Sequence, residues 1–138
     1  MENNKFDVWI KNLQEFSDED KDKCRGISCD IIEIALCVRK NGILIAQERL
    51  PQLTGDMFLQ NTVSSILSST ALPFAKTQEI TEKIQGEIME GDYKGAELLK
   101  RILVIEGAIS IYQGNNPMAT SNYLNKFFGE NYLHLNHK

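Results

Sequence analysis

Apolar residues recur at three- and four-residue intervals along nearly the whole chain, which is the spacing of helices buried on one face. The first such group predicts a short helix and comprises Phe6, Trp9, Ile10 and Leu13. Ser17 followed by Asp20 predicts the start of a second helix, because a serine hydroxyl caps a helix and acidic residues favour its first turn. No segment alternates apolar and polar residues as a half-buried strand would. The pattern therefore predicts an all-α fold.

A long helix is expected to follow and to run to about Arg49. Its apolar positions hold one face: Ile27, Ile31, Ile34, Ala35, Val38, Ile43 and Leu44. Gly42 interrupts this pattern, and glycine inside a helix costs about 1 kcal/mol relative to alanine. Gly42 is therefore expected to be a kink, a break or a point of close packing. Pro51 is expected to end the helix, because its ring clashes with the preceding turn.

Capping residues and glycines divide the rest of the chain. After a turn at Thr54-Gly55, Asp56 is expected to cap a helix whose inner face is Phe58, Leu59, Thr62, Val63, Ile66 and Leu67. A helix over 73–90 follows, with its inward residues at Phe74, Ile80, Ile84 and Ile88. Gly91 is expected to stop that helix, and Asp92 to cap an apolar helix that reaches about Gln113.

The last helix is expected over 117–128. Gly114 suits the left-handed conformation that ends a helix, Asn116 is a good N-cap, and Pro117 suits the first helical position. The aromatic residues of this segment, together with Trp9 and Tyr132, are expected in the core: Tyr123, Phe127 and Phe128. Gly129 is expected to end the helix and residues 129–138 to form a loose tail. The whole chain, 1–138, is thus predicted to be a single domain, an irregular bundle of about six helices.

Composition narrows the classes of function. The chain has 138 residues, 15 basic and 19 acidic side chains, and a net charge of -4. No stripe of lysine and arginine is visible, which argues against nucleic acid as a partner. The amino-terminal residues contain no apolar signal segment, and no apolar run approaches the ~20 residues of a membrane-spanning helix. Three cysteines without a disulfide framework fit a reducing compartment, so a cytoplasmic location is expected.

Neither metal binding nor catalysis finds a good pattern. Cys24, Cys29, His134 and His137 have poor zinc-ligand spacing, and Cys29 and Cys37 are interpreted as small apolar side chains near a buried helix face. The alternating acids that begin at Asp18 do not fit a calcium loop, since glycine and glutamate are missing at its sixth and twelfth positions. The chain shows no nucleophile with a base, no phosphate-binding loop and no metalloprotease motif. We therefore expect no cofactor, no metal, no catalytic residue and no enzymatic activity.

Two segments resemble one known family. Residues 35–48 read A-L-C-V-R-K-N-G-I-L-I-A-Q-E and precede D-M-F-L at 56–59. Residues 105–117 read I-E-G-A-I-S-I-Y-Q-G-N-N-P. In this order, and with the family's residue spacing within the second segment, they resemble the cytoplasmic region of the flagellar motor stator A subunit, the bacterial MotA/PomA family. The resemblance covers about residues 30–128, and its structural signature is Gly42, Glu106, Gly107, Gly114, Asn116 and Pro117.

The resemblance implies a protein partner, namely the flagellar rotor switch protein or another motility component, or a regulatory role derived from it. In the family, charges on the first cytoplasmic helix contact the rotor. By position, Arg39 is retained and Gln47 stands where the family has a glutamate. Glu48 lies next to Gln47 and could substitute for that glutamate, but on a different helical face. Arg39, Lys40, Gln47 and Glu48 are the candidate partner-binding residues. The membrane spans of the family are absent, so the chain resembles only the cytoplasmic half of a stator subunit. Whether nature or a designer removed those spans stays open.

Three expectations make the resemblance testable. The helix at 95–113 is expected to pack against the segment 28–49, and residues 84–97 are expected to form a short link. Glu106, inside an apolar run, is expected to pair with Arg39, Lys40 or helix-end amides, because an unpaired buried carboxylate is costly.

The alternative is an unrelated all-α adaptor or regulatory protein, and a small enzyme or metal-binding protein comes third. Self-association into a homo-oligomer stays open.

Overall fold

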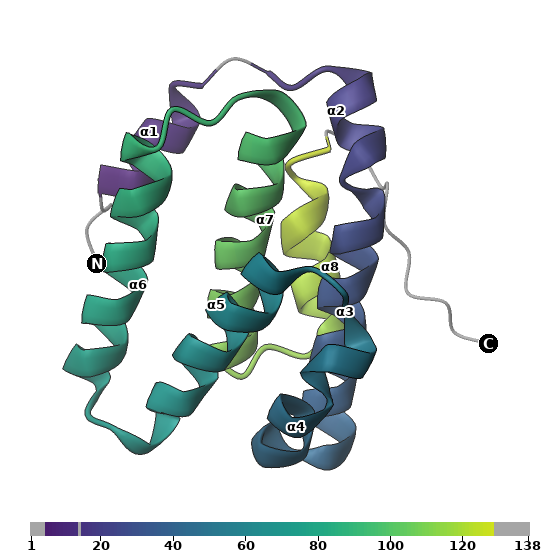
Figure 1. Ribbon diagram of the computed structural model, residues 1–138, viewed down its shortest axis with the longest axis vertical. Coiled ribbons are helices and arrows are strands. Elements are labelled where there is room, and N and C mark those ends of the chain that lie inside the picture. Colours follow the sequence, from purple (N-terminus) through teal and green to yellow (C-terminus); the bar gives the residue numbers. More distant parts are fainter. Residues whose placement is uncertain (1–4, 14, 129–138) are drawn as a thin grey trace.

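The protein folds as a bundle of helices arranged around one central helix (Figure 1). The computed structural model describes residues 5–13 and 15–128. Within them lie eight α-helices and one short 3-10 helix. In chain order they are α1 (Lys5–Lys11), α2 (Asp18–Lys23), α3 (Arg25–Asn41), α4 (Ile43–Leu53), α5 (Met57–Ser68), η1 (Ser69–Ala71), α6 (Phe74–Glu90), α7 (Gly95–Tyr112) and α8 (Pro117–Asn125). The described residues contain no strand, so the all-α prediction is confirmed, with eight helices rather than about six.

Helix α7 is the centre of the bundle. It packs against α2, α3, α5, α6 and α8, and it is apolar on nearly all sides. Its buried residues run almost without interruption from Leu98 to Ile111. A helix that is apolar all round must be enclosed by other elements, which is why the remaining helices surround α7. Most of the other core residues come from the inner faces of α3 and α5.

The predicted packing of the segment 28–49 against the helix at 95–113 is confirmed for the part of that segment that lies in α3, which contacts α7. Helix α4 instead packs against α3 and α5. Residues 84–97 are largely helical, because they comprise the end of α6, the turn at 91–94 and the start of α7. The expected short link is therefore only this turn.

Three predicted caps are confirmed. Oxygens of the Ser17, Asp56 and Asn116 side chains accept hydrogen bonds from the backbone N–H three residues on, at 3.1, 2.9 and 2.7 Å. Gly114 has φ +84°, in the left-handed region as expected, and Pro117 occupies the first position of α8. Local chemistry thus determines where α2, α5 and α8 begin.

The predicted long helix is broken in two at Gly42. This residue has φ +93° and ψ 167°, a conformation closed to most other residues, and it separates α3 from α4. Pro51 does not end the element, since α4 continues to Leu53. Because proline has no N–H, Pro51 cannot donate to the carbonyl four residues earlier, and α4 ends two residues after it.

Four further expectations need correction. Asp92 does not cap α7, because it has φ +58° and Lys94 holds the N-cap position without a side-chain hydrogen bond. Phe74 is 64 % exposed, since it begins α6 at a corner of the bundle. Cys29 is exposed because Ile31 and Ile34 turn the opposite side of α3 toward the core, whereas Cys37 is buried as expected. Helix α8 ends at Asn125, not at 128.

The aromatic residues of the carboxy-terminal segment behave largely as expected. Phe128 is buried, whereas Tyr123 and Phe127 are half-buried and pack edge to face. Trp9 is half-buried and stacks on Phe6. The expectations for Tyr132, Gly129 and the tail 129–138 lie outside the described residues.

Candidate functional site

The sequence-predicted partner residues gather on the hairpin formed by α3 and α4. The Gly42 N–H donates to the Val38 carbonyl at 2.8 Å, and the Gly42 carbonyl accepts from the Ala46 N–H at 3.1 Å. Gly42 thus ends one helix and begins the next without an intervening loop. Because α4 folds back against α3, Arg39 and Lys40 on one helix end lie next to the first turns of the other.

The charged partner residues of this hairpin are exposed. Arg39, Lys40 and Glu48 are all exposed, and none of them forms an ion pair with a described residue. Gln47 differs, because its side-chain amide donates to the Ser68 hydroxyl at 2.8 Å and so ties α4 to α5. The structure therefore leaves Arg39, Lys40 and Glu48 available to a partner and uses Gln47 within the fold.

Exposed apolar side chains accompany these charges. Leu44 is 76 % exposed and Ile45 is 39 % exposed. Residues four positions apart are neighbours on a helix, so Leu44 lies beside Glu48 and Ile45 beside Arg49. The α3–α4 hairpin thus presents apolar surface rimmed by charges of both signs, which is the usual anatomy of a protein-binding surface.

The second signature segment builds the junction of α7 with α8. Glu106 is buried, and its expected pairing with Arg39, Lys40 or helix-end amides is wrong. Its carboxylate instead accepts a short hydrogen bond from the Tyr123 hydroxyl of α8. Burial raises the pKa of Glu106 above its usual value, and the Tyr123 hydrogen bond offsets this only in part. Glu106 therefore fastens α8 to the central helix.

Small residues let α7 pack closely against α3 and α8. A Cβ atom on Gly107 would lie 2.6 Å from Cγ2 of Ile31, so any other residue would force Ile31 to move where α7 crosses α3. Ser110 and Thr120 share a buried hydroxyl hydrogen bond of 2.8 Å, and the Asn115 amide donates to Ser110 at 2.9 Å. Sequence reasoning recognised the small residues but missed their hydrogen-bond partners, which lie up to ten positions away.

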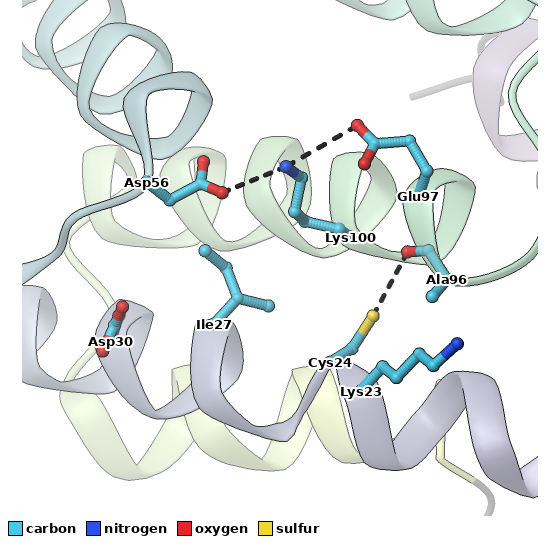
Figure 2. A pocket seen from close by; sticks show the side chains of 8 residues that line it. All are labelled: Lys23, Cys24, Ile27, Asp30, Asp56, Ala96, Glu97 and Lys100. Atoms are coloured by element: carbon cyan, nitrogen blue, oxygen red, sulfur yellow. Dashed lines mark hydrogen bonds and ion pairs between the residues drawn. The ribbon is translucent and has the colours of Figure 1, made fainter.

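A pocket missed by sequence reasoning lies between α3, α5 and α7 (Figure 2). Its volume is about 340 Å³. Lys100 lies at its centre, with Nζ 3.0 Å from Asp56 and 3.6 Å from Glu97. Although burial acts to raise it, hydrogen bonds from the Leu59 N–H and from Lys100 hold the pKa of Asp56 below its usual value. Asp56 thus both caps α5 and joins it to α7.

The same pocket contains a cysteine with low reactivity. The Cys24 thiol donates to the Ala96 carbonyl at 3.3 Å. Burial, together with the nearby Asp20, raises the pKa of Cys24 from 9.0 to about 11. Because the thiolate is the nucleophilic form, this cysteine is a poor nucleophile at neutral pH. Lys100 pairs with Asp56 and Glu97 inside the pocket, whereas Lys23 and Asp30 bind Glu19 and Thr54 outside its lining. These contacts support the packing of α3, α5 and α7.

The described residues offer no group of three or more histidine, cysteine, aspartate or glutamate side chains placed to hold a metal ion. His134 and His137, considered above as zinc ligands, lie outside those residues. None of the helices in the described part of the chain has the length and apolar character needed to cross a bilayer.

Comparison with known proteins found no match: no family model, no curated protein and no solved structure is significantly similar to this chain.

Proposed function

We propose that this chain is a non-catalytic helical module that binds a protein partner through its α3–α4 hairpin. Following the resemblance of residues 30–128 to the stator A subunit, the partner is the flagellar rotor switch protein or a related motility component. The proposal places Arg39, Lys40 and Glu48 in the contact.

The observation that carries the proposal is the set of unpaired charges around exposed apolar residues on the hairpin. Arg39, Lys40 and Glu48 form no ion pair with a described residue. Leu44, which lies between Lys40 and Glu48 in the sequence, has 76 % of its surface exposed. Surface charges of this kind contribute little to folding, but they govern encounter rate and the choice of partner. A hairpin without a loop also holds them at a fixed spacing.

The packing of α3 against α7 supports the stator relation. The resemblance requires the segment around Gly42 and the segment around Gly107 to belong to one packed unit. Helix α3, which leads into Gly42, packs directly on α7 through Ile31 and Gly107. Chance similarity of two unrelated helices would not demand this close crossing.

The chemistry of the central pocket supports a binding role rather than a catalytic one. Lys100 is held between two carboxylates, and the Cys24 thiol stays protonated at neutral pH. The groups that could act as nucleophile or general base are thus occupied in holding helices together.

Binding to the purified rotor switch protein tests the proposal. We expect calorimetric titration to detect an interaction that weakens as salt rises, because exposed charges are screened. Arg39→Glu should weaken it by about tenfold or more, since a reversed charge repels where it attracted. Lys11→Glu is the matched control, because Lys11 is also an exposed basic residue and belongs to α1, at the opposite end of the molecule from α4 (Figure 1).

Two outcomes would overturn the proposal. The first is no measurable binding by the wild-type chain. The second is equal loss of affinity in Arg39→Glu and Lys11→Glu, which would show that overall charge and not the hairpin controls binding. Leu44→Ser adds an independent check, because it removes apolar contact from the hairpin without touching a buried residue.

A further inference from the structure

Helix α6 lies at one edge of the bundle, with one side exposed (Figure 1). Its inner side packs on α7, α5 and α1, where Thr77, Gln85 and Ile88 are buried. The exposed charges of α6 are Lys76, Glu79, Glu82, Lys83, Glu87 and Glu90. Four of them, Lys76, Glu79, Lys83 and Glu87, alternate in sign and form a charged stripe, whereas Glu82 projects about 60° to one side of it.

An apolar groove runs beside this charged stripe, between α5 and α6. The groove has a volume of about 490 Å³. Phe58, Ile80 and Ile84 form its apolar floor and are only half-buried. Lys83 and Glu87 line it from α6, and neither forms an ion pair with another described residue. The groove therefore combines incompletely buried apolar surface with charges that still lack a partner.

The four charges of the stripe and the two isoleucines of the groove, Ile80 and Ile84, lie on one surface of α6. At 3.6 residues per turn, the stripe and the two isoleucines fall within an arc of about 140°. Such an arc is wide enough to form the contact face of one helix packed against another.

The order of the four stripe charges is self-complementary when the helix direction is reversed. Glu90, which lies on the same face in the last turn of α6, falls opposite the uncharged Pro73 in this arrangement. If two copies of α6 run antiparallel about a two-fold axis near residues 81 and 82, Lys76 lies opposite Glu87 of the second copy. In the same register Glu79 lies opposite Lys83, and Ile80 lies opposite Ile84. The three pairings agree on the position of the axis to within about half a residue, or roughly 0.75 Å along the helix. A parallel pairing in register would instead place like charges together.

We infer that two copies of this protein form a two-fold symmetric dimer, in which the α6 helices pack antiparallel and close the α5–α6 grooves. A two-fold interface uses the same patch on both copies, which is what the reversed charge order requires. The isoleucines and Phe58 contribute the apolar contact, and the charges select the register. The exposed Lys76–Glu79 pair within α6, at 3.6 Å, is weak enough to rearrange on pairing. This inference goes beyond the proposed function and uses a different surface from the α3–α4 hairpin.

Sedimentation of the full chain over about 1 µM to about 1 mM tests the dimer, because the monomer has a mass of 15.7 kDa and the dimer twice that. Lys83→Glu places like charges together twice per dimer and should weaken dimerisation by about tenfold or more. The double variant Lys83→Glu with Glu79→Lys restores opposite charges and should recover most of the affinity. Glu33→Lys, an exposed reversal on α3, should leave the dimer unchanged.

The charge swap separates this inference from a merely structural effect. Recovery in the double variant supports the antiparallel register, because two surface changes that only harmed the fold would add rather than cancel. The inference is overturned if the wild-type chain stays monomeric throughout the series. It is also overturned if Lys83→Glu dimerises as well as the wild type, or if the double variant is as weak as the single one.

Discussion

Replacing Gly107 by alanine tests the close crossing of α3 and α7. Two effects oppose each other in this substitution. Alanine favours the helix by about 1 kcal/mol relative to glycine. The added methyl group would lie 2.6 Å from Cγ2 of Ile31, a fully buried side chain that must then move. Overpacking of this kind costs about 1–3 kcal/mol, so the net change should range from near zero to a loss of about 2 kcal/mol.

Gly86→Ala supplies the matched control. Gly86 also lies inside a helix, but a Cβ atom there meets nothing within 4 Å. It should therefore show the helix-propensity gain of about 1 kcal/mol without an overpacking cost. The difference in the free energy of unfolding between the two variants isolates the crossing, and we expect about 1–3 kcal/mol. Urea titration followed by far-ultraviolet circular dichroism measures both.

A third variant identifies the atom responsible. Ile31→Leu removes the Cγ2 methyl group while conserving side-chain volume, and by itself should cost less than about 1.5 kcal/mol. In that background Gly107→Ala should become less harmful, and a double-mutant cycle measures the coupling. The reasoning is refuted if Gly107→Ala stabilises the protein as much as Gly86→Ala does.

Two further predictions concern the carboxylates of the core. Asp56→Ala removes both the cap of α5 and the Lys100 ion pair and should cost about 1–2 kcal/mol in urea unfolding, whereas Asp56→Asn, which still caps, should cost less. Because the pKa of Asp56 is lowered, its carboxylate contributes to the free energy of unfolding above the ordinary pKa of 3.8, and this contribution is lost as pH falls through the native pKa. The Asn variant should therefore lose less stability in acid than the wild type, and equal losses would contradict this. The raised pKa of Glu106 has the opposite sign: stability is greatest below its ordinary value of 4.5 and declines as pH rises through the native pKa. Glu106→Gln, which keeps an acceptor for Tyr123, should therefore gain stability relative to wild type as pH rises above 4.5, and a difference that is constant with pH would rule this out.

The sequence by itself determined those features that depend on neighbouring residues. Ser17, Asp56 and Asn116 each cap a helix by bonding to a backbone N–H three residues away, so the relevant partner is always visible in the chain. The all-α class follows in the same way, because helical periodicity is a local pattern. The left-handed Gly114 followed by Asn116 and Pro117 likewise predicted the turn into α8.

Only the tertiary structure decided which distant groups meet. The partner of Glu106 is Tyr123, 17 positions away, and that of Lys100 is Asp56, 44 positions away. No sequence spacing predicts either pairing, because each depends on how α8 or α5 packs against α7. The tertiary structure also decided that Gly42 separates two helices and that Phe74 is exposed. Helical periodicity predicts the inner face of each helix, but it does not predict where the bundle ends.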